Sequence, residues 1–399
     1  MPAFLDAISG AGWVRGFLPL FNRFGQSVPP LLASGPLRNS RSKRPWLVAS
    51  TLGMGLPMLI IGLVWLFCYQ KPPTWLWMGY LLMYGLFFAS AGINQLSFGT
   101  LQGKLIRPHR RGRLLGIGGM AGSLIAATAA FLWLGEWLNM PENFGFVWIF
   151  CVVGVGLSCS SIVLWWVIEP ESEVTTTDNQ PSTNPFLNAA RTIARDRHLL
   201  RTVIVAMLFS LSSMIFPHYQ WLGRHHLGLT ENQIAQQMMY WVIVQNLSVG
   251  LFSLFAGTIA DRFGNRLALQ IQVFGCSLAP LTAIGMTWLP EGQGANWFWL
   301  TYVLLALVPV TMKTLVNYTL ELAHEEDHPR YVSAVTACMA LPFIGSPLLG
   351  LAVDRSVTLV FLGGGTAILC GFLLALTLPE PRHWADEHRS GNHHIQEKP

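Results

Sequence analysis

The sequence predicts an all-α membrane protein made of two pseudo-symmetric helical bundles. Three observations predict this fold class: 52% of the residues are apolar while only 11% are charged, about eleven apolar segments are long enough to cross a bilayer, and basic residues gather in alternate connections. A water-soluble chain of 399 residues would need far more charge to cover its surface. The formal charge of +5 does not indicate a nucleic-acid partner, because the basic residues lie in short runs between apolar segments. The lipid bilayer is therefore the expected solvent.

The apolar segments are predicted to be transmembrane helices, because a helix needs roughly 20 apolar residues to cross the hydrocarbon. The first segment is the weakest, since Arg23 interrupts it. The predicted segments are 16–36, 46–68, 75–98, 114–137, 145–168, 201–222, 237–259, 266–289, 297–320, 331–352 and 357–378.

These segments form an N-terminal bundle (1–168) and a C-terminal six-helix bundle (201–379). A central loop (169–200) joins them, and a polar tail (380–399) follows. Within the loop, the polar and proline-containing stretch 172–185 is predicted to be a flexible linker.

The second part of the central loop, residues 186–200, is predicted to form a short amphipathic helix on the membrane surface. At helical spacing its apolar residues share one face, opposite two arginines. The apolar face contains Phe186, Leu187, Ala190, Ile193 and Ala194, and the arginines are Arg191 and Arg195.

The distribution of basic residues predicts the orientation in the membrane. Three of them (Lys71, Arg224 and Arg355) lie in one set of connections. Nineteen lie in the other set, which comprises 37–45, 104–113, 169–201, 260–266, 323–330 and the tail. The central loop and the C-terminus are therefore expected to be cytoplasmic, in a multi-pass protein of the plasma (inner) membrane.

The chain contains an internal repeat, as membrane carriers commonly do. Residues 105–122 align with 322–341, and residues 35–44 align with 257–266. The second half has six predicted crossings and the first has five, so segment 201–222 has no partner. The opening residues MPAFLDAIS look like the last turns of a helix. We therefore predict that the natural protein begins upstream of Met1, or that this chain is truncated inside its first helix.

The segment GTIADRFGNR (257–266) resembles the conserved loop G-x-x-x-D-R-x-G-x-R of the major facilitator superfamily (MFS). The motif positions are occupied by Gly257, Asp261, Arg262, Gly264 and Arg266. The first-half copy is degraded: Gly35 and Arg44 are present, but Asn39 and Ser40 replace the aspartate and the arginine. The resemblance implies twelve helices, of which about eleven are present, and alternating access to a central cavity.

Asp261 has two interpretations. Its carboxylate could pair with Arg262 or Arg266 in one conformation and lose that pair when the bundles separate, which would favour one state by a kcal/mol or two. Alternatively, the loop is a solvated signal of topology.

Polar side chains inside predicted spans are candidates for substrate binding, because burying an ionisable group at the membrane centre costs roughly 2.5–3.5 kcal/mol. Arg23 lies within its span, Gln26 follows it, and the repeat places Gln245 and Asn246 at a similar depth. Arg23 could instead extend outward to the membrane surface or pair with a residue of the absent helix.

Lys313, Asn317 and Glu321 are spaced at i, i+4 and i+8, which predicts one polar helical face. Such a face either lines an aqueous path or joins a structural network between helices. Asn94 and Gln95 lie late in their segment, and His218 follows a proline near an outer helix end. His218 could bind substrate or sense pH, but a histidine near an interface is more often solvated.

Two glycine-rich stretches, 116–127 and 342–350, are expected to serve close helix packing and bending. The six cysteines lie singly in apolar segments, and no Cys/His spacing suits a metal. A GxxxxGK[ST] phosphate loop is also missing, which argues against an ATP-driven pump. We expect no metal and no cofactor.

These observations favour a secondary active or facilitative transporter for a small polar or anionic solute, and not an enzyme. The alternative is a non-transporting membrane scaffold or sensor on the same fold. A monomer is expected, and a coupling ion is left open.

Overall fold

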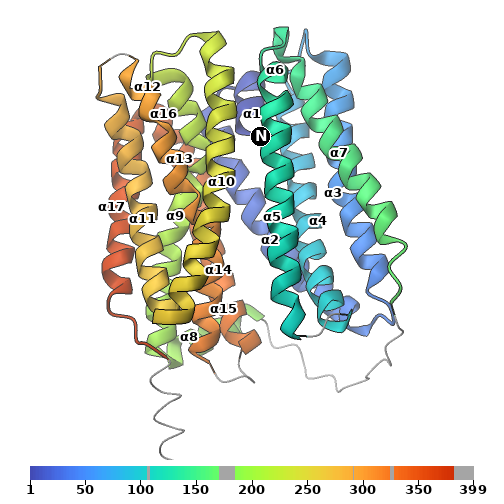
Figure 1. The fold of residues 1–399 in the computed structure, drawn as a ribbon, viewed down its shortest axis with the longest axis vertical. Coiled ribbons are helices and arrows are strands. Elements are labelled where there is room, and N and C mark those ends of the chain that lie inside the picture. The colour runs from blue at the N-terminus through green and yellow to red at the C-terminus, as the bar shows by residue number, and fades with distance from the viewer. Residues whose placement is uncertain (106–107, 170–184, 291, 324–327, 382–399) are drawn as a thin grey trace, which may run out of the picture.

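The computed structural model describes residues 1–105, 108–169, 185–290, 292–323 and 328–381, and all regular structure within these ranges is helical. The predicted tail lies outside them, apart from its first two residues. The first-half helices α3, α4 and α7 lie on one side of the molecule, and the second-half helices α9, α11 and α17 lie on the other (Figure 1).

The first half contains seven α-helices and two short turns. Its elements are α1 (Pro2–Ile8), α2 (Gly12–Asn39), α3 (Arg44–Cys68), α4 (Leu76–Leu105), α5 (Pro108–Ala129), the π-helical turn η1 (Ala130–Leu134), α6 (Gly135–Leu138), the 3₁₀ turn η2 (Pro141–Asn143) and α7 (Gly145–Leu164).

The second half begins with a short helix before its membrane spans. Its elements are α8 (Pro185–Arg195), α9 (Arg197–His226), α10 (Glu231–Phe263), α11 (Asn265–Thr287), α12 (Gln293–Trp297), α13 (Trp299–Leu305), α14 (Leu307–Glu321), α15 (His328–Ala340), the 3₁₀ turn η4 (Leu341–Gly345), α16 (Ser346–Arg355) and α17 (Val357–Ala375).

Ten helical runs in the described part of the chain are long and apolar enough to cross a membrane. They correspond to the predicted segments from 46–68 onward. The predicted segment 16–36 is not one of the ten, but it does form a helix: α2 has 28 residues and spans about 42 Å. It contains four prolines and three arginines, which explains why its apolar character is weak.

Three predicted segments contain a change of helix type or a turn. The π-helical turn η1 interrupts 114–137, and η4, which contains Pro342, interrupts 331–352. Residues 297–320 are divided at Phe298 and Ala306, which keep right-handed helical backbone angles, so that this run stays nearly continuous.

The single amphipathic helix predicted over 186–200 is wrong in extent. Asp196 has an extended backbone, and its carboxylate accepts hydrogen bonds from the amides of His198 and Leu199, so that α8 ends and α9 begins there. Helix α8 packs against α15 and the start of α9, where Thr192 is buried.

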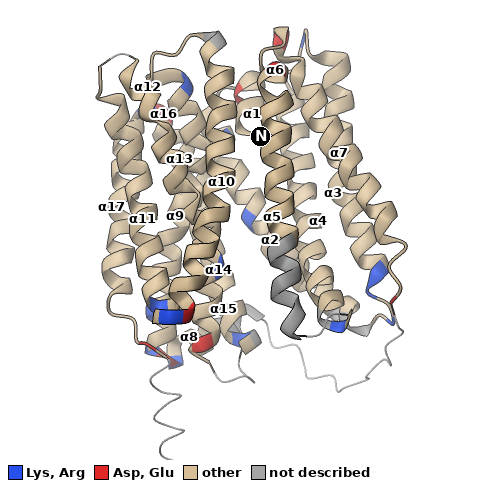
Figure 2. Cartoon of the chain, in the orientation of Figure 1, with Lys and Arg blue, Asp and Glu red and all other residues tan. Residues whose placement is uncertain are grey.

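Two seams join the halves. Helix α2 packs against α4 in its own half and against α16 and α9 in the other, and α5 packs against α10. In Figure 2, the charged residues lie mainly toward the lower end of the molecule, where α8 and the beginnings of α9 and α15 lie. We call this the basic end, and the opposite end the outer end.

Aromatic side chains fill the core of each half. In the first half, Phe4 of α1 is fully buried, and its ring centroid lies 4.9–5.2 Å from those of Trp65, Tyr80, Phe146 and Phe150. The expectation that the opening residues form helical turns is confirmed, because Pro2–Ile8 is the helix α1.

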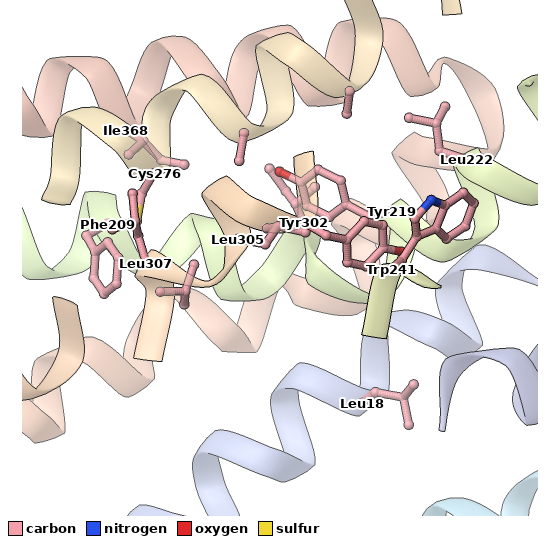
Figure 3. Close-up of a cluster of buried hydrophobic side chains, with 14 of the residues drawn as sticks. Leu18, Phe209, Tyr219, Leu222, Trp241, Cys276, Tyr302, Leu305, Leu307 and Ile368 are labelled. Atoms are coloured by element: carbon pink, nitrogen blue, oxygen red, sulfur yellow. The ribbon is translucent and has the colours of Figure 1, made fainter. Parts of the chain in front are cut away.

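In the second half the core is built around Tyr219, Trp241 and Tyr302 (Figure 3). The rings of Trp241 and Tyr302 stack at 5.2 Å.

The glycine predictions have opposite outcomes. A Cβ built on Gly350 would collide with the backbone of Gly12, which confirms close packing for the second glycine-rich stretch. Cβ atoms on Gly118, Gly119 and Gly122 would meet nothing within 4 Å, so the prediction of close packing is wrong there.

Candidate functional site: a cavity between the two halves

A cavity of about 390 Å³ lies between the halves, bounded by α2 and α4 on one side and α14 and α15 on the other. Its lining combines polar and apolar side chains, as is usual for a site that binds a small molecule. The lining residues are Arg23, Gln26, Ser27, Gln95, Met312, Lys313, Leu315, Val316, Asn317, Thr319, Val332, Val335, Thr336 and Met339.

Five of the ten candidates from the sequence meet in this cavity: Arg23, Gln26, Gln95, Lys313 and Asn317. They come from both halves of the chain. The cavity lies where α2 passes its midpoint and where α14 and α15 approach the basic end.

Arg23 bridges the two halves. Its Nη2 donates a hydrogen bond of 3.4 Å to the backbone carbonyl of Thr336 on α15. Its Nε is buried and has no hydrogen-bond partner among the described residues. A half-buried guanidinium whose Nε is buried and unmatched is suited to an anionic ligand, because that donor requires an acceptor.

The second cation is Lys313 on α14, one helical turn from Asn317, and both side chains line the cavity. Across the cavity, the side-chain amide of Gln26 donates to Asn22 Oδ1 at 3.0 Å, which orients its carbonyl oxygen and amide. Among the residues that the structure describes, the lining contains two cationic side chains and no carboxylate. Its electrostatic character is therefore positive.

The other five candidates lie elsewhere. The Asn94 amide donates to Thr51 Oγ1 at 2.6 Å and to Ser50 Oγ at 3.2 Å, which ties α4 to α3. Asn246 donates to the carbonyl of Val242 on its own helix, and Gln245 does not line the cavity.

Glu321 and His218 also lie outside the cavity. Glu321 accepts a hydrogen bond of 2.7 Å from the side chain of Asn265 at the start of α11. His218 has an exposed fraction of 0%, so the interpretation of a solvated histidine is wrong.

An ion cluster that the sequence pattern did not indicate joins the halves at the outer end. Arg15 of α2 has no exposed side-chain surface and lies 2.6 Å from Asp6 Oδ1 and 3.3 Å from Asp354 Oδ1. Its guanidinium also lies 4.8 Å from the centre of the Trp221 ring on α9. One cation thus connects α1 and α2 to α16 and α9. We call Arg15, Asp6, Asp354 and Trp221 the Arg15 cluster.

Close contact between backbones brings this cluster together. The amide of Gly12 donates to Asp354 Oδ2 at 2.7 Å. Cβ atoms on Gly12, Gly16 or Gly350 would collide with the facing helix. Small residues four apart on both helices, Gly12 and Gly16 against Ser346 and Gly350, allow this approach, and that spacing is the sequence signal that could have identified the seam.

At the basic end, Glu169 holds the first half together. It follows α7, its side chain is 2% exposed, and it lies 2.9 Å from Lys104 Nζ at the end of α4. It also accepts hydrogen bonds from the amides of Lys43 and Arg44 at the start of α3 and from the Ser42 hydroxyl. Burial alone would raise the pKa of Glu169, but these hydrogen bonds outweigh it and lower the pKa to about 2.

Replacing Glu169 by glutamine is expected to lower the free energy of unfolding by about 2 kcal/mol at neutral pH, because charge-assisted hydrogen bonds are lost. A lowered pKa means that this stability is complete above the unfolded value, about 4.5, and is lost as the pH falls toward 2. Thermal unfolding of wild type and Glu169→Gln from pH 7 to 3 measures the difference. The difference in stability between wild type and Glu169→Gln should shrink below pH 4.5. The control Glu142→Gln, at the exposed outer end, should show no such pH-dependent difference from wild type.

The motif loop of the second half lies between α10 and α11. Gly264 has a positive φ of 93°, which favours glycine, and a Cβ there would lie 2.7 Å from Glu380 Oε1. Arg266 donates to the carbonyl of Leu376 at 3.0 Å, which ties α11 to the end of α17. Arg262 and Asp261 are exposed, and the role of Asp261 as an ionic latch stays a prediction.

Comparisons with known proteins agree with this architecture. The family model described as Major Facilitator Superfamily matches residues 23–341. A D-xylose–proton symporter structure has a TM-score of 0.66 at 14% identity and covers 93% of this chain and 88% of its own. A nucleoside transporter structure has a TM-score of 0.61 at 13% identity and covers 95% of this chain and 93% of its own. A fucose:proton symporter structure of E. coli has a TM-score of 0.59 at 13% identity and covers 94% of this chain and 93% of its own. None of the curated proteins matches in sequence.

The fold and the cavity define a multi-pass membrane transporter. The chain belongs to the Major Facilitator Superfamily, since the family model covers most of its length. It is a secondary transporter and not an enzyme.

Proposed function

We propose that the protein carries a small organic anion across the membrane by alternating access, and that Arg23 and Lys313 bind the anion. One observation carries the proposal: in the described part of the chain, the cavity between the halves is lined by two cations and no carboxylate. An anionic group would satisfy the buried Nε of Arg23 and offset the charge of Lys313.

The position of the cavity supports alternating access. It is bounded by helices of both halves, so a relative motion of the halves changes its shape directly. The Arg15 cluster and the Gly12–Gly350 contact hold α2 against α16 at the outer end, and the cavity lining comes from parts of α4, α14 and α15 that are nearer the basic end, which supports an opening toward that end. One chain supplies both sides of the cavity, which supports a monomer as the transporting unit.

We also propose the plasma (inner) membrane as the location, with the basic end and the C-terminus in the cytoplasm. The support is the excess of Lys and Arg in the connections of that end. In this orientation the cavity faces the cytoplasm in the described conformation.

Ligand stabilisation tests the proposal. The purified full chain is heated in the presence of mono- and dicarboxylates, sugar phosphates and inorganic phosphate, each paired with a neutral compound of similar size. A bound anion at 100 times its Kd is expected to add about 2.7 kcal/mol of stability. Stabilisation by neutral sugars or nucleosides, with none by any anion, would contradict an anion site.

A further inference from the structure

A second cavity, of about 430 Å³, lies at the basic end of the second half, where α8, the start of α9 and the start of α15 meet. It is separate from the central cavity and shares no lining residue with it. Its lining residues are Thr192, Arg195, Asp196, Arg197, His198, Arg330 and Tyr331.

The lining of this cavity has an excess of positive charge. In the described part of the lining, three arginines and a histidine face one carboxylate, that of Asp196. This carboxylate already accepts hydrogen bonds from the amides of His198 and Leu199 and from the Tyr331 hydroxyl at 2.8 Å. Arg195 and Arg197, on either side of it, are exposed.

Two further features favour an anionic ligand. The amino end of α9, a helix of 30 residues, opens at the cavity and adds a partial positive charge. Arg330 Nε donates to Thr192 Oγ1 at 2.5 Å, which ties α15 to α8 and holds this guanidinium at the cavity. Planar guanidinium groups bind phosphate oxygens in pairs, so a phosphate is the matching chemistry.

The position of the cavity at the start of α9 favours a lipid as the source of the phosphate. Helix α9 is long and apolar enough to cross a membrane and begins at Arg197, so we expect its first turn to lie near the lipid headgroups. We propose that this cavity binds the phosphate of an anionic phospholipid in the leaflet at the basic end. The proposal concerns a lipid site beside the transport pathway and does not depend on the identity of the solute.

The site is linked to the central cavity through α15. Arg330 and Tyr331 line the lipid site, and the next residue, Val332, lines the central cavity. A bound headgroup would hold α8 against α15 in the described arrangement. Transport is therefore expected to respond to the lipid.

The acidic residues Glu325, Glu326 and Asp327 precede Arg330 in the sequence and lie outside the described residues. For this reason the test uses Arg195 and Arg197, which lie on the opposite side of the cavity from α15. Both are exposed, so the double substitution Arg195→Gln with Arg197→Gln is expected to leave the fold intact. The matched control is Arg191→Gln with Arg201→Gln, which removes the same charge from the same two helices outside the cavity.

Binding is measured on the full chain in detergent with short-chain phosphatidylglycerol, by thermal shift and by native mass spectrometry of retained lipid. Wild type and the control are expected to bind it, and the Arg195/Arg197 variant to bind at least about 10-fold more weakly. The proposal is overturned if that variant binds like wild type, if the control loses as much affinity, or if phosphatidylcholine binds equally well. Glycerol phosphate binding as tightly as the lipid would overturn the assignment to a lipid.

Discussion

Replacing Arg15 by alanine is expected to open the outer end of the transporter. The substitution removes the cation that lies between Asp6 and Asp354 and leaves two carboxylates facing each other. Removing one partner of a buried ion pair costs about 3–5 kcal/mol, and the lower part of that range applies because Asp354 is 33% exposed. The loss is relieved when the halves separate and water reaches both carboxylates. The population of the outward-open state is therefore expected to rise by about 100-fold.

A cysteine at Ser346 reports this opening. The Ser346 side chain has 0% exposure and lies in the α2–α16 seam. In a background without the six native cysteines, a membrane-impermeant maleimide added from outside should label Ser346→Cys slowly in the parent protein and at least about 10-fold faster with Arg15→Ala. Arg355→Ala, which removes a neighbouring exposed charge, should leave the rate unchanged.

A second substitution opens the same seam without a change of charge. The Cβ of Gly350→Ala would collide with the carbonyl of Gly12 and push α16 away from α2. It should also accelerate labelling, which distinguishes opening from a failure of Arg15→Ala to fold. If both variants fold and label as slowly as the parent, the Arg15 cluster does not close the outer end.

Replacing Lys313 by alanine is expected to weaken binding of the transported anion by about 10- to 100-fold. Lys313 lines the central cavity, and a hydrogen bond to a charged group contributes about 1.5–3 kcal/mol. Arg23→Ala should lower the affinity as well, and in addition it removes the contact with the Thr336 carbonyl. Lys313→Ala is therefore the cleaner test, because it leaves the hydrogen bond between Arg23 of α2 and Thr336 of α15 intact.

The measurement is the Kd of the anion that stabilises wild type most, determined for both variants. Lys71→Ala, in an exposed outer connection, is the control and should bind with the wild-type Kd. If Lys313→Ala and Arg23→Ala both keep the wild-type Kd, the anion binds elsewhere and the assignment of the cavity fails.

The membrane spans could be predicted from the sequence because burial in lipid requires long apolar runs whatever the neighbouring helices are. The division between α8 and α9 could not, since helical periodicity continues through Asp196 while its side chain caps the second helix. The turn η4 could not be predicted either, because a proline inside an apolar segment can kink, break or only bend a helix.

The candidate site could be predicted in part, for reasons of helix geometry. Lys313 and Asn317 are four residues apart and share a face, whereas eight residues rotate Glu321 by about 80° and move it about 12 Å along the axis, where it meets Asn265. Asn94 and Gln95 are adjacent and point about 100° apart, so Gln95 reaches the cavity while Asn94 contacts α3.

The Arg15 cluster could not be predicted from local pattern. Arg15 and Asp354 are 339 residues apart and meet only because α2 and α16 pack at Gly12 and Gly350. Asp354 lies beside Arg355, just outside the predicted segment 331–352.

Anion exchange across a membrane tests the account most directly. The purified protein is placed in vesicles loaded with the unlabelled anion that stabilises it most, and uptake of the labelled anion is followed. We expect rapid exchange by wild type and at least about 10-fold slower exchange by Lys313→Ala at the same low anion concentration. Binding of the anion without any exchange by wild type would contradict transport and would indicate a membrane sensor or scaffold.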